Sequence, residues 1–124
     1  MSEFTAALEA ALLRELRITY DWENRVRFRS ALTPAVLVLT DATTRLGQWL
    51  PRSRHLELSR PLLLDRPWPE AVSVLGHEMA HQFVDEVLKV VGEPAHGPTF
   101  QRVCAERGLD AAAAGIPAVH ADAG

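Results

Sequence analysis

The sequence predicts an α+β fold, and three observations carry this prediction. Residues 69–90 repeat apolar side chains at three- and four-residue steps, the period of a helix with one buried face. Three shorter stretches between residues 35 and 59 have the length and composition of strands. A sheet and a long helix that are each apolar on one side bury those sides against one another. The expected order is therefore helix, small sheet, long helix and last helix.

The N-terminal part begins with a predicted amphipathic helix over residues 4–16. Its apolar stripe consists of Phe4, Ala7, Leu8, Ala11, Leu12 and Leu16. Residues 18–32 stay ambiguous. Val26 and Phe28 alternate with arginines, as in a strand, and a continuation of the helix fits equally.

We expect a small, mostly antiparallel sheet of about three strands. The first strand is the apolar run over residues 35–40. Residues 45–50 and 54–59 then form a hairpin around the turn at 51–53, where proline and serine break the pattern.

Three helical segments follow the predicted sheet. Residues 59–64 form a short helical turn, and the long helix over 69–90 ends before Gly92. The last helix covers residues 98–107 and is closed by Gly108, since glycine readily adopts the left-handed conformation at a helix C-terminus.

The most informative motif is His77-Glu78-Met79-Ala80-His81, in the middle of the long helix. Residues four apart share one face of a helix, so the imidazoles of His77 and His81 can grip one ion. Glu78 then lies beside the ion, where a general base can act on a water molecule. This pattern is typical of zinc hydrolases.

A third ligand is needed, because a catalytic zinc usually takes three protein ligands. Val87 occupies the position where a metzincin has its third histidine, which excludes that class. The candidates are His96, which precedes Gly97 in a turn, and Glu93 as a carboxylate ligand. We favour His96 because a short turn before a helix can reach back to the motif.

Several segments, taken in order, resemble SprT-like zinc metallopeptidases, the family of Spartan and its relatives. They are Leu46-Gly47-Gln48-Trp49, Arg54 to Ser59, Pro61 to Leu64, the His77 to His81 motif, His96-Gly97-Pro98-Thr99-Phe100, and Gly108-Leu109. The resemblance covers about residues 46–109 and, more weakly, the segment from Phe4 onward. It implies a minimal zincin-like, gluzincin-like protease core.

The resemblance also implies the roles of the site residues. Zinc would be held by His77, His81 and His96, with Glu78 as the general base, and the reaction would be endopeptidase cleavage of protein substrates. Spartan-type members cut proteins crosslinked to DNA, so DNA-protein crosslink repair is the implied context. The alternatives are an inactive, zinc-stabilised binding module and a zinc hydrolase that acts on a non-peptide bond.

The charge distribution gives DNA binding no support. The formal net charge is −3. Residues 14–66 hold ten arginines against six acids, a balance of +4, whereas residues 67–124 hold three basic residues against eight acids, a balance of −5. A single cysteine also excludes the cysteine-rich zinc ribbon that many relatives carry, so DNA remains an unsupported partner.

Composition predicts one domain over residues 1–110 and a flexible, alanine-rich tail over 111–124. No signal peptide and no membrane-spanning run is recognisable, and Cys104 can form no internal disulfide. We therefore expect a cytoplasmic protein that is not bound to membranes. Cys104 is expected to be a small core residue. The sequence does not indicate the oligomeric state.

Supporting roles around the motif stay open. Asp85 lies four residues after His81 and either orients its ring or faces water as a surface acid. The donor that stabilises the oxyanion could be His55, Tyr20 or an arginine. His120 is expected to have no role.

Segment 54–58 is one candidate for an exposed edge strand above the metal, to which a substrate adds as an extra strand. Its charged residues, Arg54 and Glu57, suit such an edge. The alternative is an ordinary internal strand.

Overall fold

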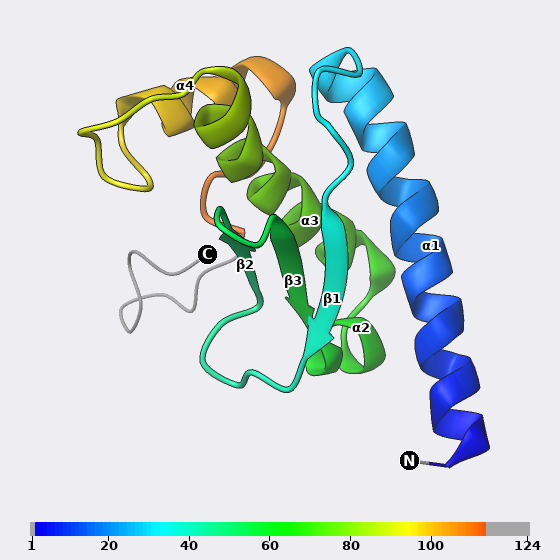
Figure 1. The fold of residues 1–124 in the computed structure, drawn as a ribbon. Helices are drawn as coiled ribbons and strands as arrows, with labels where there is room; N and C mark the ends of the chain where they lie inside the picture. Colours follow the sequence, from blue (N-terminus) through cyan, green and yellow to red (C-terminus); the bar gives the residue numbers. More distant parts are fainter. Residues whose placement is uncertain (1, 114–124) are drawn as a thin grey trace.

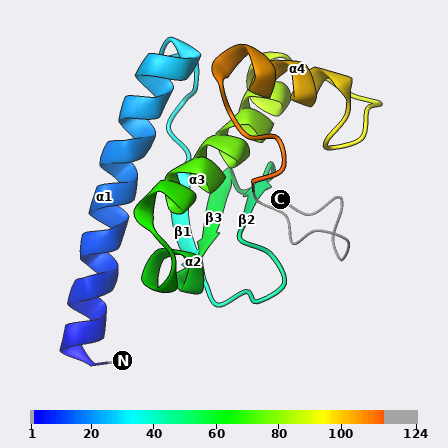
Figure 2. The same ribbon diagram turned by 180° about the vertical axis from the view of Figure 1, so that it is seen from behind.

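The computed structural model describes residues 2–113 and has the predicted α+β architecture (Figure 1). Its elements are α1 (Glu3–Phe28), β1 (Val36–Thr40), β2 (Gly47–Leu50), β3 (His55–Ser59), α2 (Arg60–Asp65), α3 (Trp68–Gln82), the π-helix η1 (Phe83–Val87) and α4 (Pro98–Arg107). Helix α3 crosses one face of the sheet, α1 stands beside β1, and α4 lies at the far end of α3 (Figures 1 and 2). Among these residues no helix combines the length and the apolar character needed to cross a membrane.

The sheet is mixed, and not mostly antiparallel as expected. Its order is β1-β3-β2, in which β3 pairs in parallel with β1 and antiparallel with β2. The chain reverses direction at each connection, but β3 inserts between the two earlier strands. The first and third strands, which run the same way, therefore become neighbours.

The edge-strand hypothesis for segment 54–58 is wrong, and the internal alternative is right. Strand β3 is paired on both sides, with Leu56 and Leu58 buried. The charges that suggested an edge are paired instead: Arg54 binds Glu86 with an N···O distance of 2.6 Å, and Glu57 lies 3.7 Å from Arg45. The edge that lies next to α3 is β2.

Helix α1 continues without a break to Phe28, which resolves the ambiguous segment as helical. Tyr20, Asn24 and Phe28 are buried at four-residue spacing, whereas Val26 is 54% exposed. The burial of this face makes the segment helical, although Val26 and Phe28 alternate with arginines as in a strand. The predicted apolar stripe is only partly inward, because Leu16 is in the core but Phe4 is 79% exposed.

The long helix changes character directly after the motif. Helix α3 is α-helical to Gln82, and the next residues form the π-helix η1, in which the Leu88 amide donates to the Phe83 carbonyl at 3.0 Å. The helix ends at Val87, three residues before the predicted end at residue 90, and Lys89 just beyond it has a positive φ of 54°.

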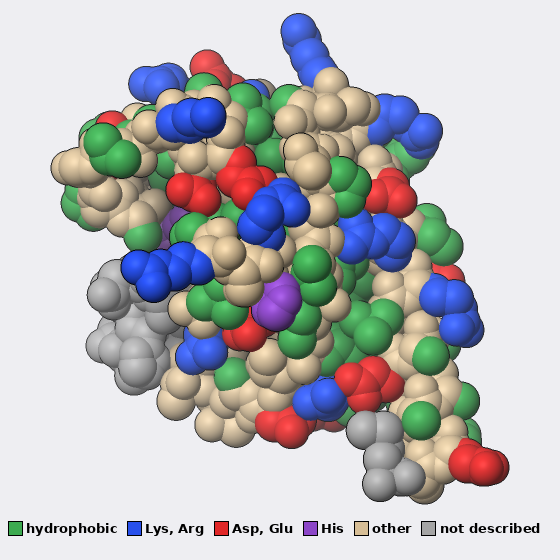
Figure 3. All heavy atoms as spheres, viewed as in Figure 1, with side chains coloured by type: hydrophobic (Ala, Val, Ile, Leu, Met, Phe, Trp, Pro, Cys, Tyr) green, Lys and Arg blue, Asp and Glu red, His purple; other side chains and the backbone are tan. Residues whose placement is uncertain are grey.

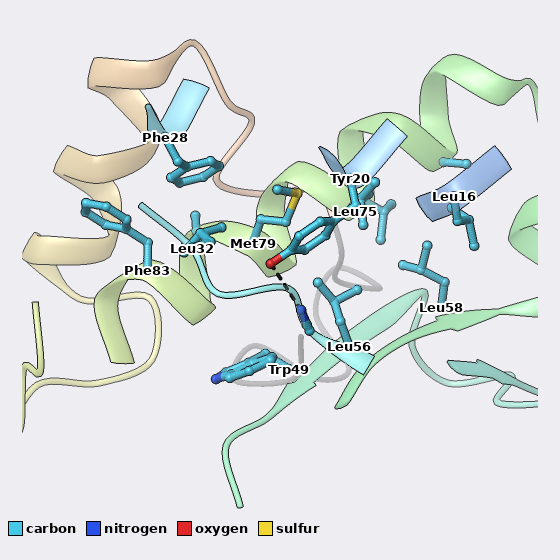
Figure 4. Packing of buried hydrophobic residues seen from close by; sticks show 14 of the residues in the cluster. Leu16, Tyr20, Phe28, Leu32, Trp49, Leu56, Leu58, Leu75, Met79 and Phe83 are labelled. Atoms are coloured by element: carbon cyan, nitrogen blue, oxygen red, sulfur yellow. Dashed lines mark hydrogen bonds between the residues drawn. The ribbon is translucent and has the colours of Figure 1, made fainter. Parts of the chain in front are cut away.

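The core lies between the sheet, α1 and α3 (Figure 4). Leu56 and Leu58 of β3 point toward Leu75 and Met79 of α3, and the Phe28 and Phe83 rings pack with centroids 5.5 Å apart. This packing covers the face of α3 that points away from the motif histidines.

A buried polar network ties α1 to the end of α3. The Tyr20 hydroxyl donates to Gln82 Oε1 at 2.7 Å, and Gln82 Nε2 donates to the Thr33 carbonyl at 2.8 Å and to Glu86 Oε1 at 3.0 Å. Arg54 closes the network with two hydrogen bonds to Glu86. Gln82 follows His81 directly, so the network fixes the rotation of the helix at the motif.

We expect Tyr20→Phe and Gln82→Met each to lower the free energy of unfolding by about 1–3 kcal/mol, because each leaves a buried partner unsatisfied. The double variant should cost less than the sum, by about 0.5 kcal/mol or more, since both remove the same bond. Urea unfolding measures these values. Thr19→Val, which removes the exposed bond from Thr19 to Glu15, is the control; strict additivity would mean that Tyr20 and Gln82 are not coupled.

Candidate metal centre

Helix α3 places His77 and His81 one turn apart on the side that faces α4. His77 is fully buried and His81 is half-buried. His96 arrives from the turn that precedes α4, where the Gly97 amide donates to the Pro94 carbonyl at 2.9 Å. The structure thus brings the three predicted histidines together from two separate segments.

The three imidazoles converge on one point through their Nε2 atoms. His96 Nε2 lies 3.2 Å from His81 Nε2 and 3.3 Å from His77 Nε2, and all three ligand atoms lie within 4.8 Å of one another. Zinc–nitrogen bonds of about 2.0–2.1 Å in a tetrahedron place two ligand nitrogens about 3.3–3.4 Å apart. The histidines are therefore positioned to bind a metal ion, and the spacing fits zinc.

A backbone carbonyl sets the tautomer of His77. Its Nδ1 lies 3.1 Å from the Asp110 carbonyl oxygen, which can only accept, so Nδ1 carries the proton. In the neutral ring the Nε2 lone pair then faces the other histidines, as metal binding requires. Sequence reasoning missed this contact, because a backbone acceptor leaves no side-chain signature.

The glycine before the motif permits this contact. A Cβ atom on Gly76 would lie 2.7 Å from Leu109 Cδ2, so a side chain at this position would have to displace Leu109. Gly108 ends α4 in the left-handed conformation, with φ 67°, and turns the chain back toward α3. Gly76 and Gly108 together therefore let segment 108–110 lie against α3. In the sequence, Gly76 is the residue that could have indicated this close approach.

Phe100 of α4 packs against all three histidines. Its ring stacks on His81 with centroids 4.1 Å apart and an interplanar angle of 17°, and its centroid lies 4.9 Å from that of His77 and 5.0 Å from that of His96. Phe100 is 1% exposed. Phe100 belongs to the segment His96 to Phe100, which resembles the family, but its contact with the three histidines was not predicted.

Glu93, the alternative third ligand, is engaged elsewhere. Its carboxylate accepts hydrogen bonds from the Thr99 amide at 2.9 Å and the Thr99 hydroxyl at 2.7 Å, and these bonds lower its pKa. Glu93 thus caps the first turn of α4. The histidine cluster found among residues 2–113 contains His96 and not Glu93.

Glu78 is fully buried next to the two helix histidines. Burial raises the pKa of its carboxyl group to about 8, opposed in part by the Trp49 amide and the charge of Arg45. Neither carboxylate oxygen forms a well-made hydrogen bond with the described residues. A buried carboxylate without a hydrogen-bond partner is costly, and a nearby cation with its bound water would favour the charged form of Glu78.

Strand β2 borders the site, and among residues 2–113 no strand pairs with its outer edge. The Ser59 amide donates to the Leu46 carbonyl at 2.9 Å, and bonded and non-bonded pairs alternate along an antiparallel ladder. The β2–β3 register therefore turns the backbone groups of Gly47 and Trp49 away from β3. Asp85 accepts a hydrogen bond from the Trp49 indole at 3.2 Å, so this bond holds β2 against η1.

A cleft of about 240 Å³ opens between β2, η1 and the loop before α4. It is lined by Gln48, Trp49, Pro51, His81, Val84, Asp85, Val90, Glu93, Pro94, Ala95 and Phe100. Because His81 is one of its walls, a molecule in this cleft lies beside the metal position.

The remaining sequence candidates lie away from the cluster or outside the described residues. The Tyr20 hydroxyl is bonded within the core. Cys104 is buried, as predicted, and burial raises the pKa of its thiol to about 11. His120 and most of the predicted tail lie outside residues 2–113.

The fold and the site define a class: an α+β protein that carries an H-E-x-x-H helix, a third histidine from a following turn and a buried glutamate. The chain belongs to the SprT-like family, whose family model matches residues 4–118. No match was found among curated proteins.

The third ligand can be identified by comparing two variants. His96→Ala should weaken zinc affinity more than about 100-fold because it removes a direct ligand. Glu93→Gln should leave zinc affinity unchanged but cost roughly 1 kcal/mol of stability, since it weakens the cap of α4. Competition with a chromophoric chelator measures affinity, and thermal unfolding measures stability. The reverse pattern would make Glu93 the ligand.

Phe100→Leu should weaken zinc affinity by roughly tenfold or more, because the histidine rings lose the surface that orients them. Val103→Ala is the matched control, a 1% exposed residue on the same helix. Equal losses of affinity in the two variants would show that general destabilisation, and not ring orientation, is responsible.

Proposed function

We propose that this protein is a zinc-dependent endopeptidase that cleaves protein substrates. The observation that carries the proposal is the buried carboxylate of Glu78, which accepts no well-made hydrogen bond from the described residues and lies beside three convergent imidazoles. A purely structural metal site needs no such group, and burying it without a partner costs stability. Membership of the SprT-like family is consistent with this role.

The donor set determines the roles of the residues. His77, His81 and His96 would hold the metal through Nε2, and three ligands leave one position open for a substrate or water. A zinc ion held there would supply a Lewis acid for a substrate carbonyl and for an attacking water. Glu78 takes the proton from that water and passes it to the leaving amine.

The free edge of β2 favours a polypeptide over other substrates. An extended chain can pair with the outward backbone groups of Gly47 and with the Trp49 carbonyl, and so gain main-chain hydrogen bonds without any requirement for sequence. The adjacent cleft beside His81 can receive a side chain. This arrangement supports peptide hydrolysis over the hydrolysis of a non-peptide bond and over a binding module without activity.

Glu78→Gln should lower the cleavage rate of an unfolded protein by about 10²–10⁴-fold, because the proton acceptor is lost. Zinc affinity should remain, since the three histidines are intact. Glu70→Gln changes an exposed acid in the first turn of the same helix and should have no effect.

The assay is run with zinc, with a chelator, and with and without single-stranded DNA. Chelation should abolish cleavage by the wild type. Full activity of Glu78→Gln, or activity that survives the chelator, would refute the mechanism. Zinc binding without cleavage under every condition would identify a binding module. Stimulation by DNA would support substrates held on DNA.

A further inference from the structure

Helix α1 exposes a cluster of large hydrophobic side chains, flanked by charged ones, on the side that no part of the described structure covers. The buried face contains Leu16, Tyr20, Asn24 and Phe28. On the opposite side, a seven-residue repeat with steps of three and four runs along the helix. We name the part of it from residue 11 to 29 the outer stripe; it consists of Ala11, Glu15, Ile18, Trp22, Arg25 and Arg29.

The outer stripe exposes large hydrophobic side chains. Ile18 is 61% exposed and Trp22 is 55% exposed, and the neighbouring Val26 is 54% exposed. Both ribbon views show no other element beyond this side of α1, and in the space-filling view hydrophobic side chains lie at the surface there between charged ones (Figures 1, 2 and 3). Large hydrophobic side chains that lie together at the surface mark a candidate interaction site.

We propose that the outer stripe is a dimerisation surface whose partner is α1 of a second copy of this chain, packed antiparallel. Steps of three and four residues place the residues of the outer stripe on one side of the helix, where a second helix can pack beside Ile18 and Trp22. In the antiparallel pair, Ile18 of each copy faces Trp22 of the other. The Arg25 guanidinium lies 5.1 Å from the centre of the Trp22 ring in the same helix, so the tryptophan is held in place before association.

Charge complementarity selects the second copy and its direction. In the antiparallel register, Glu15 of each copy faces Arg25 of the other, which gives two opposite-charge pairs around the Ile18–Trp22 contacts. A parallel pair would oppose Glu15 to Glu15 and Arg25 to Arg25, and like charges repel. If the antiparallel partner were shifted along α1 by two seven-residue repeats, Glu15 of each copy would face Ala11 of the other. Glu15 would then have no cation opposite it.

The dimer leaves the metal centre accessible. Helix α1 stands beside β1, whereas the histidines and the cleft lie beside β2, at the other edge of the sheet (Figure 1). Association through the outer stripe is therefore independent of the proposed peptidase activity, and zinc binding should be equal in monomer and dimer.

Sedimentation velocity of the full chain over micromolar to millimolar concentrations tests the proposal. We expect a reversible monomer–dimer equilibrium that Trp22→Ser and Ile18→Ser each weaken by at least about tenfold, as for residues at the centre of an interface. Leu64→Ser removes a hydrophobic side chain that is 54% exposed on α2 and should change nothing. A monomer at all concentrations, or a dimer that Trp22→Ser leaves intact, would overturn the proposal.

Charge reversal tests the antiparallel direction. Glu15→Arg and Arg25→Glu should each prevent self-association, because each places like charges opposite one another. An equimolar mixture of the two variants should form a heterodimer, since both cross-helix pairs are then of opposite sign. If the mixture associates no more strongly than either variant alone, the antiparallel pairing is wrong.

Discussion

The structure depends on the complete burial of the middle of α3. Every residue from Val74 to Ala80 is buried, so most of the motif lies in a buried segment of helix, and only His81 at its end is half-buried beside the cleft. The sheet and α1 cover one side with apolar groups, and α4 covers the other with Phe100. A carboxylate in such a place favours its neutral form unless a cation is near, and the convergent imidazoles provide the place for that cation. The fold and the proposed site therefore share one requirement, a cation beside the buried carboxylate of Glu78.

The sequence predicted those parts of the site that rest on local spacing. His77 and His81 follow from the period of a helix, and His96 follows from a turn before a helix. The helices and the three strands were predictable in kind and order for the same reason. The ambiguous segment of α1 was not, because alternating arginines mimic a strand and only burial of Tyr20 and Phe28 decides between the two structures.

Contacts between distant segments were not predictable. The position of β3 between the other two strands depends on which strand of the β2–β3 hairpin pairs with β1. The charged residues of segment 54–58 suggested an edge strand, but their partners, Arg45 and Glu86, lie on other segments of the chain. The packing of Phe100 on three rings and the carbonyl of Asp110 depend equally on tertiary structure. Only Gly76, where a side chain would have to displace Leu109, marked such an approach within the sequence.

The bond from His77 to the Asp110 carbonyl bears on how short the working unit can be. The last helix ends at Arg107, and a chain trimmed at that visible boundary would keep all three imidazoles and the glutamate. It would lose the acceptor that keeps the proton on Nδ1, and the lone pair of Nε2 would no longer be held ready for an ion. The smallest fragment that keeps the proposed site intact thus extends past α4, into a turn that by its own sequence looks dispensable.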